Sequence, residues 1–288
     1  MKIGIVGLGN MGQQIAHRLL SHGHEVIGYD THSISSSIHS VKSLDELIQK
    51  TSIVWLMIPH TSVDEVIKEI LLHKPNGLTV IDGGNSNYHD TIRRAEVCQS
   101  KNITYIDVGV SGGIISHHGF CLMIGGDKQS VENLQPLWAA LSAPQATLYC
   151  GPSGSGHYVK MIHNGIEYGL LQAYAEGIMM LKEGPNQSLH VEEIINVWNH
   201  GSLIGSRLLE LFNTALQSPQ LKSISGSIAE SGMGAWMADE AHRAKIPTPV
   251  LHAALHVRAL SRKNGGNFAT KLIAFVRHLF GGHAIEKL

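Results

Sequence analysis

The chain has 288 residues, with 22 Lys and Arg against 23 Asp and Glu and a formal net charge of −1. This length is too great for one small core and predicts two globular domains. The near-neutral balance provides no broad basic field and no polybasic stretch, which argues against binding of nucleic acid or of an anionic membrane. With 43% hydrophobic and 16% charged residues, the chain can bury a sizeable core and is not expected to be disordered.

The cysteines and the N-terminal segment bear on the compartment. Cys98, Cys121 and Cys150 are too few and too scattered for a disulfide framework, so a reducing compartment fits best. Lys2 precedes an apolar run as in a signal peptide, but Gly, Asn and Gln interrupt the run and no small-residue cleavage site follows. No uninterrupted apolar run approaches the roughly 20 residues that a bilayer span requires. We therefore expect a cytoplasmic protein without a membrane segment.

Short apolar runs alternate with amphipathic stretches from the N-terminus to about Cys150. The apolar runs are KIGIV, EVIGYD, SIVWLMI and LTVID, and between them lie MGQQIAHRLL, SLDELIQK and SVDEVIKEILL. This alternation predicts parallel strands joined by crossover helices, and continuous apolar strands indicate a sheet that helices cover on both faces. The pattern continues through ITYIDVGV, FCLMIGG and ATLYC.

After the segment GPSGSG the strand pattern ends, and helical patterns run almost to Leu288. We therefore predict an α/β domain of the Rossmann type over residues 1–152, with a doubly wound, mainly parallel sheet. An all-α domain that binds substrate and mediates dimerisation is expected over residues 153–288.

The first predicted strand ends in a glycine turn of the pattern G-x-G-x-x-G. Gly7, Gly9 and Gly12 follow the strand directly and open a helix, where backbone amides can receive a pyrophosphate. Asp30 ends the next strand, at roughly the 20-residue offset where an acid accepts hydrogen bonds from an adenosine ribose. This context predicts dinucleotide binding, since a turn built for packing alone would not require the acid. The predicted cofactor site comprises Gly7, Gly9, Asn10, Met11, Gly12, Asp30, Pro59 and Asn85.

Asp30 also bears on which dinucleotide binds. A carboxylate at this position repels a 2′-phosphate, and the following Thr31 and His32 supply no arginine to bind one. NAD is therefore favoured over NADP, and a turn-forming aspartate is the alternative interpretation.

The segment HYVKMIHNGIEYG places polar side chains on one face of a predicted helix. They recur at i, i+3, i+4, i+7 and i+8, as Lys160, His163, Asn164, Glu167 and Tyr168. The opposite side is apolar and carries Val159, Ile162, Ile166 and Leu170. We therefore expect a buried helix whose polar stripe meets a water-filled cleft.

Lys160 and Glu167 lie two turns apart on this face, far enough for separate roles around one small substrate. Desolvation can lower the pKa of a partly buried lysine, so that it acts as a base, and raise that of a glutamate, so that it acts as an acid. A solvated surface pair is the alternative for these two residues. Satisfied core groups are the alternative for His163 and Asn164.

Two loops lie where an open parallel sheet places its active site, beyond the carboxyl ends of its strands. Asn85 follows a strand and two glycines, so its amide is expected to reach both nicotinamide and substrate. Ser111, Gly112 and Gly113 offer a hydroxyl and backbone amides that suit a carboxylate. An ordinary turn is the alternative at each loop.

No metal site is predicted despite the 19 histidines, because the sequence has neither His-Glu-x-x-His nor a cysteine pair at zinc spacing. His252 and His256 are four residues apart and could hold a metal, but ordinary helix-face residues are the favoured interpretation. His117 and His118, adjacent in a predicted loop, are interpreted in the same way.

Five segments together resemble one family. GLGNMG, IDGGNSNYHDTIRR, GVSGG, KMIHNGIEYG and the terminal FGGH are similar to the short form of decarboxylating 6-phosphogluconate dehydrogenase. KMIHNGIEYG is the most discriminating segment, because the wider β-hydroxyacid dehydrogenase family shares the glycine turn and the lysine but lacks the run that follows. The resemblance spans the chain and implies oxidation of 6-phosphogluconate at C3, loss of CO2 and tautomerisation to ribulose 5-phosphate.

The same resemblance implies roles for individual residues. Lys160 takes the C3 hydroxyl proton and then, as an ammonium, polarises the new ketone, so that no metal is needed. Glu167 supplies a proton to C1 of the enediol. The sugar hydroxyls and the carboxylate are assigned to Asn85, His163, Asn164, Ser111, Gly112 and Gly113.

The substrate phosphate is assigned by resemblance to Tyr168, Arg258 and, from the C-terminal tail of a second subunit, Arg277. His283 of that tail would lie near the sugar, and paired arginines suit a dianion. A shared tail implies a homodimer or homotetramer, with a basic solvated tail as the alternative. The family normally has a basic residue at the position of Ala235 and a hydroxyl at that of Met237, so a different or less charged sugar acid is the alternative substrate.

Two other functions compete with this one. A β-hydroxyacid dehydrogenase without decarboxylation, such as one acting on 3-hydroxyisobutyrate, would release no CO2. A catalytically silent NAD-binding or redox-sensing protein is compatible with Ala235 and Met237, but the presence of both Lys160 and Glu167 argues against it.

Overall fold

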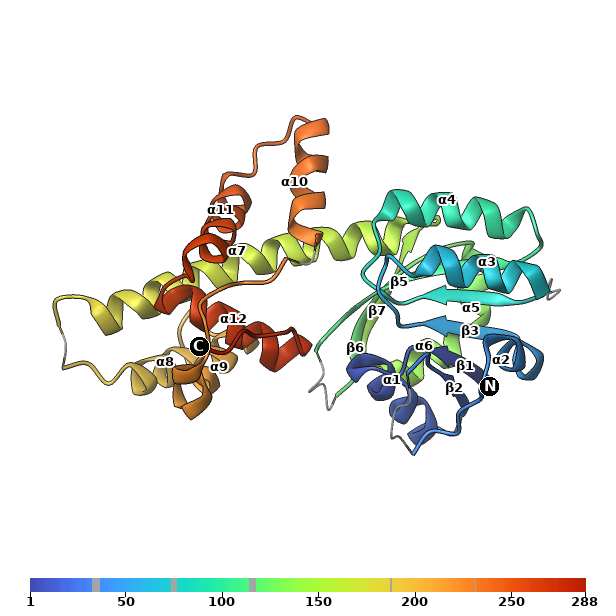
Figure 1. Cartoon of the computed structure of the whole chain (residues 1–288), viewed down its shortest axis with the longest axis horizontal. Coiled ribbons are helices and arrows are strands. Elements are labelled where there is room, and N and C mark those ends of the chain that lie inside the picture. The colour runs from blue at the N-terminus through green and yellow to red at the C-terminus, as the bar shows by residue number, and fades with distance from the viewer. Residues whose placement is uncertain (33–36, 74–76, 114–117, 187, 231) are drawn as a thin grey trace. The chain divides into compact units, whose positions relative to one another are not determined.

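The computed structural model describes residues 1–32, 37–73, 77–113, 118–186, 188–230 and 232–288. The chain divides into two compact units, Met1–Met161 and Ile162–Leu288 (Figure 1). Each unit has a hydrophobic core of its own.

Within the described residues, the first unit is built on a seven-stranded sheet in the order β2-β1-β3-β4-β5-β6-β7. Strands β1 to β5 are parallel, β6 runs antiparallel to β5, and β7 is parallel to β6. The reversal of β6 follows from its short connection to β5, since a parallel return needs a crossover of about a dozen residues or more. The predicted mainly parallel sheet is confirmed. The strands are β1 (Lys2–Val6), β2 (Glu25–Tyr29), β3 (Ile53–Leu56), β4 (Thr79–Asp82), β5 (Thr104–Ser111), β6 (Phe120–Gly125) and β7 (Ser142–Gly151).

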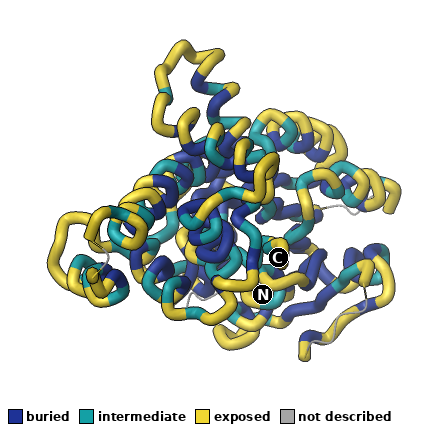
Figure 2. The backbone as a smooth tube through the Cα atoms, turned by 60° about the vertical axis from the view of Figure 1, so that its left-hand side comes forward, coloured by how far each residue is buried: buried dark blue, intermediate teal, exposed yellow. Residues whose placement is uncertain are grey.

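Helices cover both faces of this sheet, as the continuous apolar strands predict. Successive residues of a strand point to opposite faces. Trp55 of β3 packs in a core with α1 and α6, whereas Val54 and Leu56 pack with α2 and α3. Figure 2 shows the buried residues along the backbone. The helices are α1 (Asn10–Ser21), α2 (Leu44–Lys50), α3 (Val63–His73), α4 (Tyr88–Gln99), α5 (Lys128–Asn133) and α6 (Gln135–Leu141).

The second unit is helical over its described residues, apart from an isolated bridge between Ile224 and Lys287. Its core includes Leu171 of α7, Phe212 of α9 and Phe275 of α12. The all-α fold predicted for the C-terminal part is confirmed. The helices are α7 (Ser155–Glu183), which begins in the first unit, α8 (Val191–Asn199), α9 (Arg207–Gln217), the 3-10 helix η1 (Pro219–Ser223), α10 (Met233–Arg243), α11 (Pro249–Asn264) and α12 (Phe268–Gly281).

A buried carboxylate on β5 fixes the start of α7. Asp107 is 0% exposed and accepts hydrogen bonds from the backbone amides of Gly154, at 2.7 Å, and His157, at 2.9 Å. The first amides of a helix have no acceptor inside it, and the helix dipole favours a negative charge beside them. Asp107 therefore determines where α7 leaves the sheet and, one turn later, where Lys160 lies.

The burial of α7 differs from the expectation. Val159, Ile166 and Leu170 were expected to be buried, but they are 36%, 58% and 44% exposed. The polar stripe lies on the same side of the helix as the core residues Leu171, Ala175 and Ile178 that follow it, because these positions continue the same helical spacing. The expectation that the apolar side of this helix is the buried one is therefore wrong.

Replacing Asp107 by Asn should destabilise the first unit by about 2 kcal/mol, because one amide would lose a charged acceptor inside the core. The matched control is Asp127→Asn at the exposed N-cap of α5, where Asp127 accepts a hydrogen bond from the Ser130 amide at 2.9 Å. Asn is as good an N-cap as Asp, so the control should change stability little. Equal unfolding midpoints in a urea titration of the two variants would contradict the anchoring role.

Candidate active site

The three glycines of the turn after β1 lack a side chain for different reasons. Gly7 has φ +92, and a Cβ here would collide with the carbonyl oxygen of Met57. A Cβ at Gly12 would collide with the carbonyl oxygen of Gly7, whereas one at Gly9 would meet nothing within 4 Å. Gly7 and Gly12 therefore shape the turn and let α1 pack on it, and Gly9 leaves open space at the N-terminus of α1.

The N-terminus of α1 suits a pyrophosphate. Gly9 is the N-cap residue, its position carries no capping side chain, and the first turn contains no acid. The first amides of the helix, at Asn10 and Met11, can therefore donate to an anionic ligand. The helix dipole adds to this attraction.

Asp30, directly after β2, is tied to the same turn. Its Oδ2 accepts a hydrogen bond from the Leu8 amide at 2.7 Å, and its Oδ1 accepts one from the His32 amide at 2.9 Å. A carboxylate has about four lone-pair sites, so both oxygens can still accept from ribose hydroxyls. The side chain is 15% exposed, which leaves it within reach of a ligand. The turn, the helix and this acid together fit a dinucleotide.

Because β1 to β5 are parallel, the loops after them lie along one edge of the sheet. Pro59 and Asn85 are exposed there, in the loops after β3 and β4. Gly112 and Gly113 follow β5 with φ +126 and +73, values that favour glycine. The structure thus brings one group of predicted residues to this edge, namely Gly7, Gly9, Asn10, Met11, Gly12, Asp30, Pro59, Asn85, Ser111, Gly112 and Gly113.

Lys160 reaches the sheet from α7. Lys160 is 6% exposed, and a Cβ at Gly109 of β5 would collide with its Cβ. The close approach of helix and strand therefore requires glycine at position 109. The sequence analysis missed Gly109 and Asp107, although Gly109 begins the GVSGG segment that was singled out.

His163, Asn164 and Glu167 follow on the same helix and are half-buried. His163 Nδ1 and Asn164 Oδ1 are 3.0 Å apart, so Nδ1 carries the proton and donates to the amide oxygen. A rise of 1.5 Å per residue separates Lys160 and Glu167 by about 10 Å along the helix axis. An amine and a carboxyl at this spacing can serve different carbons of one sugar acid.

The second unit holds a buried guanidinium with unused donors. Arg258 of α11 is 1% exposed, and its Cζ lies 3.4 Å from the centroid of the Tyr168 ring. Its Nε, Nη1 and Nη2 have no hydrogen-bond partner among the described residues. Burial lowers the pKa of Arg258 to about 10, against the opposing effects of Tyr168 and Glu167. Such a cation is costly unless an anion pairs with it, so the arrangement suits an anionic group of a ligand.

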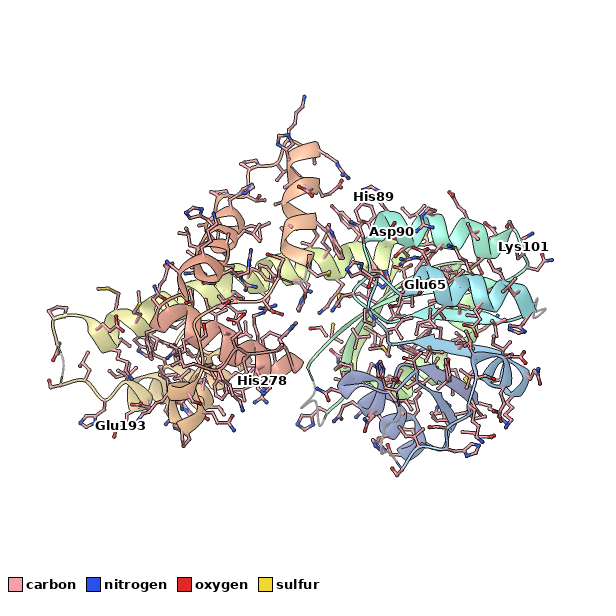
Figure 3. The ribbon with its side chains drawn as sticks, in the orientation of Figure 1. Glu65, His89, Asp90, Lys101, Glu193 and His278 are labelled. Carbon is pink, nitrogen blue, oxygen red and sulfur yellow. The ribbon has the colours of Figure 1, made fainter. Side chains whose placement is uncertain are left out.

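Arg277 and His283 complete this cluster from the same chain. Arg277 of α12 is 3% exposed and donates from Nη1 to the Ala229 carbonyl oxygen at 2.7 Å. Burial, together with the charges of Arg277 and Arg258, lowers the pKa of His283 to about 4. His278, labelled on α12 in Figure 3, donates from Nδ1 to the His283 carbonyl oxygen at 2.9 Å.

The expected origin of Arg277 in the tail of a second subunit stays a prediction, because the structure describes a single chain. The charge of Arg277 lowers the pKa of Arg258 within one chain, and α12 is a core helix of the second unit rather than a free tail. The residues after α12 are docked as well, since Leu288 donates its amide to the Ser223 carbonyl oxygen at 3.0 Å. Within this chain, Arg277 is therefore near enough to Arg258 to affect its charge.

Ala235 and Met237 both lie on α10. Ala235 is exposed. Met237 packs in an apolar cluster with Tyr168, and its Sδ lies where a Cβ at Gly165 of α7 would be. Neither position therefore offers a polar side chain to a ligand.

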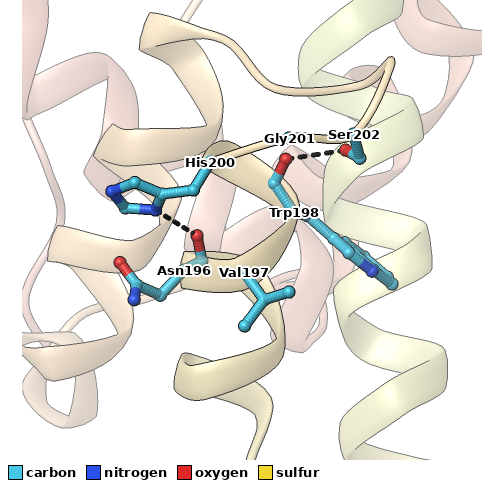
Figure 4. Close-up of a pocket in the computed structure, with 6 residues that line it drawn as sticks. All are labelled: Asn196, Val197, Trp198, His200, Gly201 and Ser202. Carbon is cyan, nitrogen blue, oxygen red and sulfur yellow. Dashed lines mark hydrogen bonds between the residues drawn. The ribbon is translucent and has the colours of Figure 1, made fainter.

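Other features of the described chain lie apart from these groups. A surface pocket at the C-terminal end of α8 contains no predicted site residue and is lined by Asn196, Val197, Trp198, His200, Gly201 and Ser202 (Figure 4). Among the residues that the structure describes, no group of three or more His, Cys, Asp or Glu could hold a metal ion. His252 and His256 are exposed on α11, His118 is exposed, and His117 lies outside the described residues. None of the described helices has the length and apolar character needed to cross a membrane.

The sheet, the glycine turn and Asp30 define a dinucleotide-binding domain followed by a helical unit. Residues 2–151 match the model of the NAD binding domain of 6-phosphogluconate dehydrogenase, and residues 156–287 match the model of that family's C-terminal domain. The chain belongs to the 6-phosphogluconate dehydrogenase family, and NAD is the cofactor of its first domain. Both expectations from the sequence are confirmed.

Individual proteins of known name are also similar to this chain. A Haloferax volcanii protein named as NAD(+)-dependent, decarboxylating 6-phosphogluconate dehydrogenase is 35% identical, covering 100% of this chain and 99% of its own. The solved structure of Plasmodium falciparum 6-phosphogluconate dehydrogenase is 31% identical with a TM-score of 0.80, covering 91% of this chain and 62% of that chain. Mycobacterium tuberculosis 3-hydroxyisobutyrate dehydrogenase shares the fold, with 20% identity, a TM-score of 0.74 and coverage of 96% and 98%.

Gly9 is exposed and Gly12 is buried, so variants at these two positions separate an effect on cofactor binding from an effect on folding. Gly9→Ala points a methyl group into open space and should weaken NAD binding about ten-fold, equivalent to 1.4 kcal/mol, while changing stability by less than about 1 kcal/mol. Gly12→Ala collides with backbone and should destabilise the fold by about 1–3 kcal/mol. Calorimetric titration with NAD and thermal unfolding measure the two effects. Unchanged NAD affinity in Gly9→Ala would refute the pyrophosphate assignment.

Proposed function

We propose that this chain oxidises 6-phosphogluconate at C3 and decarboxylates the product, giving ribulose 5-phosphate and CO2. The observation that carries the substrate assignment is Arg258, a buried cation whose three nitrogens lack an acceptor among the described residues. A phosphate dianion would accept from these donors and offset the cost of the buried charge. Arg277 adds a second positive charge, and the nearby His283 remains neutral at physiological pH because burial depresses its pKa to about 4.

The cofactor residues fit NAD. The amides at the N-terminus of α1 hold the pyrophosphate, Gly9 gives it access, and Asp30 accepts from the adenosine ribose. The charge of Asp30 opposes a 2′-phosphate, so we propose a preference for NAD over NADP. Pro59 and Asn85 are assigned to the nicotinamide end. When bound, NAD accepts a hydride from C3 of the sugar acid.

Lys160 handles the proton at the C3 oxygen. Its neutral amine takes the hydroxyl proton as C3 is oxidised to a ketone. As an ammonium it then donates a hydrogen bond to the ketone oxygen, while the bond between C2 and the carboxylate carbon breaks and CO2 leaves. The electron pair of that bond forms an enediol, and Lys160 returns its proton to the oxygen at C3.

Glu167 completes the reaction at the neighbouring carbon. Its carboxyl group protonates the former C2, which becomes C1 of ribulose 5-phosphate. The neutral amine of Lys160 takes back the hydroxyl proton at the former C3, so that the ketone of the product forms there. The substrate carboxylate is assigned to the amides and hydroxyl of Ser111, Gly112 and Gly113. Asn85, His163 and Asn164 are assigned to the sugar hydroxyls.

Further residues bear on the phosphate of the substrate and on the oligomeric state. Ala235 and Met237 offer no polar contact to a phosphate, which favours gluconate or another less charged sugar acid as the second candidate substrate. A homodimer or homotetramer in which a second subunit supplies Arg277 stays a prediction, and within one chain the charge of Arg277 already acts on Arg258.

A substrate panel tests the reaction, the phosphate and the cofactor together. Reduced nicotinamide and released CO2 are measured with 6-phosphogluconate, gluconate and 3-hydroxyisobutyrate, each with NAD and NADP. We expect kcat/KM to be highest for 6-phosphogluconate with NAD, at least about ten-fold above gluconate, because a charged hydrogen-bonded pair contributes about 1.5–3 kcal/mol. Gluconate turnover that equals or exceeds it would remove the phosphate from the assignment. Reduction without CO2 would favour a non-decarboxylating dehydrogenase, and an NADP preference would refute the role of Asp30.

Two variants of α7 separate the proton-transfer steps. Lys160→Met should lower kcat about 10³-fold through loss of the base, with NAD affinity unchanged. Glu167→Gln should retain hydride transfer but slow deuterium incorporation from heavy water into C1 of the product. Lys182→Met and Glu176→Gln, at exposed positions of the same helix, are the controls and should keep parental rates. Equal rates in a variant and its control would exclude that residue from the chemistry.

A further inference from the structure

Arg94, a buried arginine outside the proposed catalytic set, contacts the loop that follows β3. It lies on α4 and is 2% exposed. Its Nη2 donates to the carbonyl oxygen of His60 at 3.0 Å, and His60 directly follows Pro59 in the chain. Its Nε and Nη2 also donate to the two carboxylate oxygens of Asp64, both at 3.1 Å. This two-point pair ties Arg94 to the first turn of α3, immediately beyond that loop.

The opposite side of the same guanidinium contacts the loop that follows β4. Arg94 Nη1 donates to Ser86 Oγ at 3.2 Å, and Ser86 directly follows Asn85. Ser86 in turn donates to Asp82 Oδ2 at 2.8 Å, and this oxygen lies 3.7 Å from Arg94 Nη1. Ser86 and Asp82 are 1% and 0% exposed, so water does not compete for these bonds.

Asp82 is itself held from two further directions. Its Oδ2 accepts from the Tyr105 hydroxyl at 2.8 Å, and its Oδ1 accepts from the Gly84 amide at 3.1 Å. Burial, together with the charge of Asp82, raises the pKa of Tyr105 well above its ordinary value, so the hydroxyl stays a donor. The network therefore fixes both ends of the segment that carries Asn85.

We propose that Arg94 is a positioning residue for hydride transfer, which holds the loop of Pro59 and the loop of Asn85 in one fixed relation. This inference rests on the proposed roles of those two residues at the nicotinamide end. Only a planar guanidinium can donate in both directions at once, because its N–H groups point along fixed and divergent axes. A lysine has a single nitrogen and reaches one loop or the other.

The neighbouring Arg93 provides a matched control. It donates to the same Asp64, at 2.9 Å, and to Asp90 at 3.3 Å. Its side chain is 52% exposed, and its partners lie on α3 and α4 rather than on the loops. Replacing Arg93 therefore removes a charge and an Asp64 contact of the same kind but leaves both loops attached.

The test compares Arg94→Gln and Arg94→Lys with Arg93→Gln in the full chain. Arg94→Gln should raise the Kd for NAD about ten-fold and lower kcat about ten-fold, where a tenfold change corresponds to 1.4 kcal/mol. In Arg93→Gln, both quantities should stay within about two-fold of the parent. The deuterium isotope effect on kcat with 3-deuterated 6-phosphogluconate should increase in Arg94→Gln, because hydride transfer becomes slower. Arg94→Lys should recover thermal stability but not kcat. If the role of Arg94 were purely structural, this variant would restore both.

A second measurement does not depend on the reaction. Amide hydrogen exchange of residues 83–87 should be faster in Arg94→Gln and in the milder Ser86→Ala than in Arg93→Gln. Equal exchange, NAD affinity and isotope effect in the Arg94 and Arg93 variants would overturn the inference. If the parent protein oxidises no sugar acid, the proposed function fails, whereas the exchange and NAD measurements still decide the role of Arg94. A Ser86→Ala variant that behaves like the parent in all of them would also contradict it.

Discussion

The bond between Asp107 and the first turn of α7 sets the geometry on which the candidate site depends. A helix is rigid over a few turns, so fixing its first amides fixes the direction of each later side chain. Gly109, two residues along the same strand, then lets the helix approach closely enough to bury the stem of Lys160. The strand thus both anchors the helix and provides the surface on which the stem of Lys160 packs. Asp107 and Gly109 take no part in the proposed chemistry, yet they determine where it can occur.

The hydrogen bonds of two buried arginines, Arg94 and Arg258, distinguish a residue that stabilises the structure from one that is available to a ligand. Arg94 has hydrogen-bond acceptors on both sides of its guanidinium and two neighbouring carboxylates, so the protein itself satisfies its charge and its donors. Arg258 is buried to the same degree but has only the face of the Tyr168 ring and no acceptor among the described residues. Buried polar groups are nearly always paired. The unpaired one is therefore the group to consider for a ligand, whereas the paired one organises the protein around it.

Much of the first unit could be predicted from the sequence, because its signals are local. The apolar runs specify strands, and the glycine turn together with Asp30 specifies a cofactor. The face of α7 that carries Lys160 could also be read from helical spacing. Its burial could not, since exposure of Ile166 and Leu170 depends on which side the rest of α7 presents to the core of the second unit. Asp107, Arg94 and the position of Arg277 beside Arg258 were inaccessible for the same reason, as each depends on contacts between residues distant in sequence.

Met237 of α10 packs on Gly165 of α7, so the packing of these two helices depends on both residues. The thioether occupies the volume that any side chain at position 165 would need, so the helix of Lys160 and Glu167 tolerates only hydrogen there. A smaller, hydroxyl-bearing residue on α10 would leave a void above that glycine, and a larger residue on α7 would displace α10. Substitutions at the two sites should therefore covary during evolution. A change at position 237 therefore also alters the packing of the helix that carries Lys160 and Glu167.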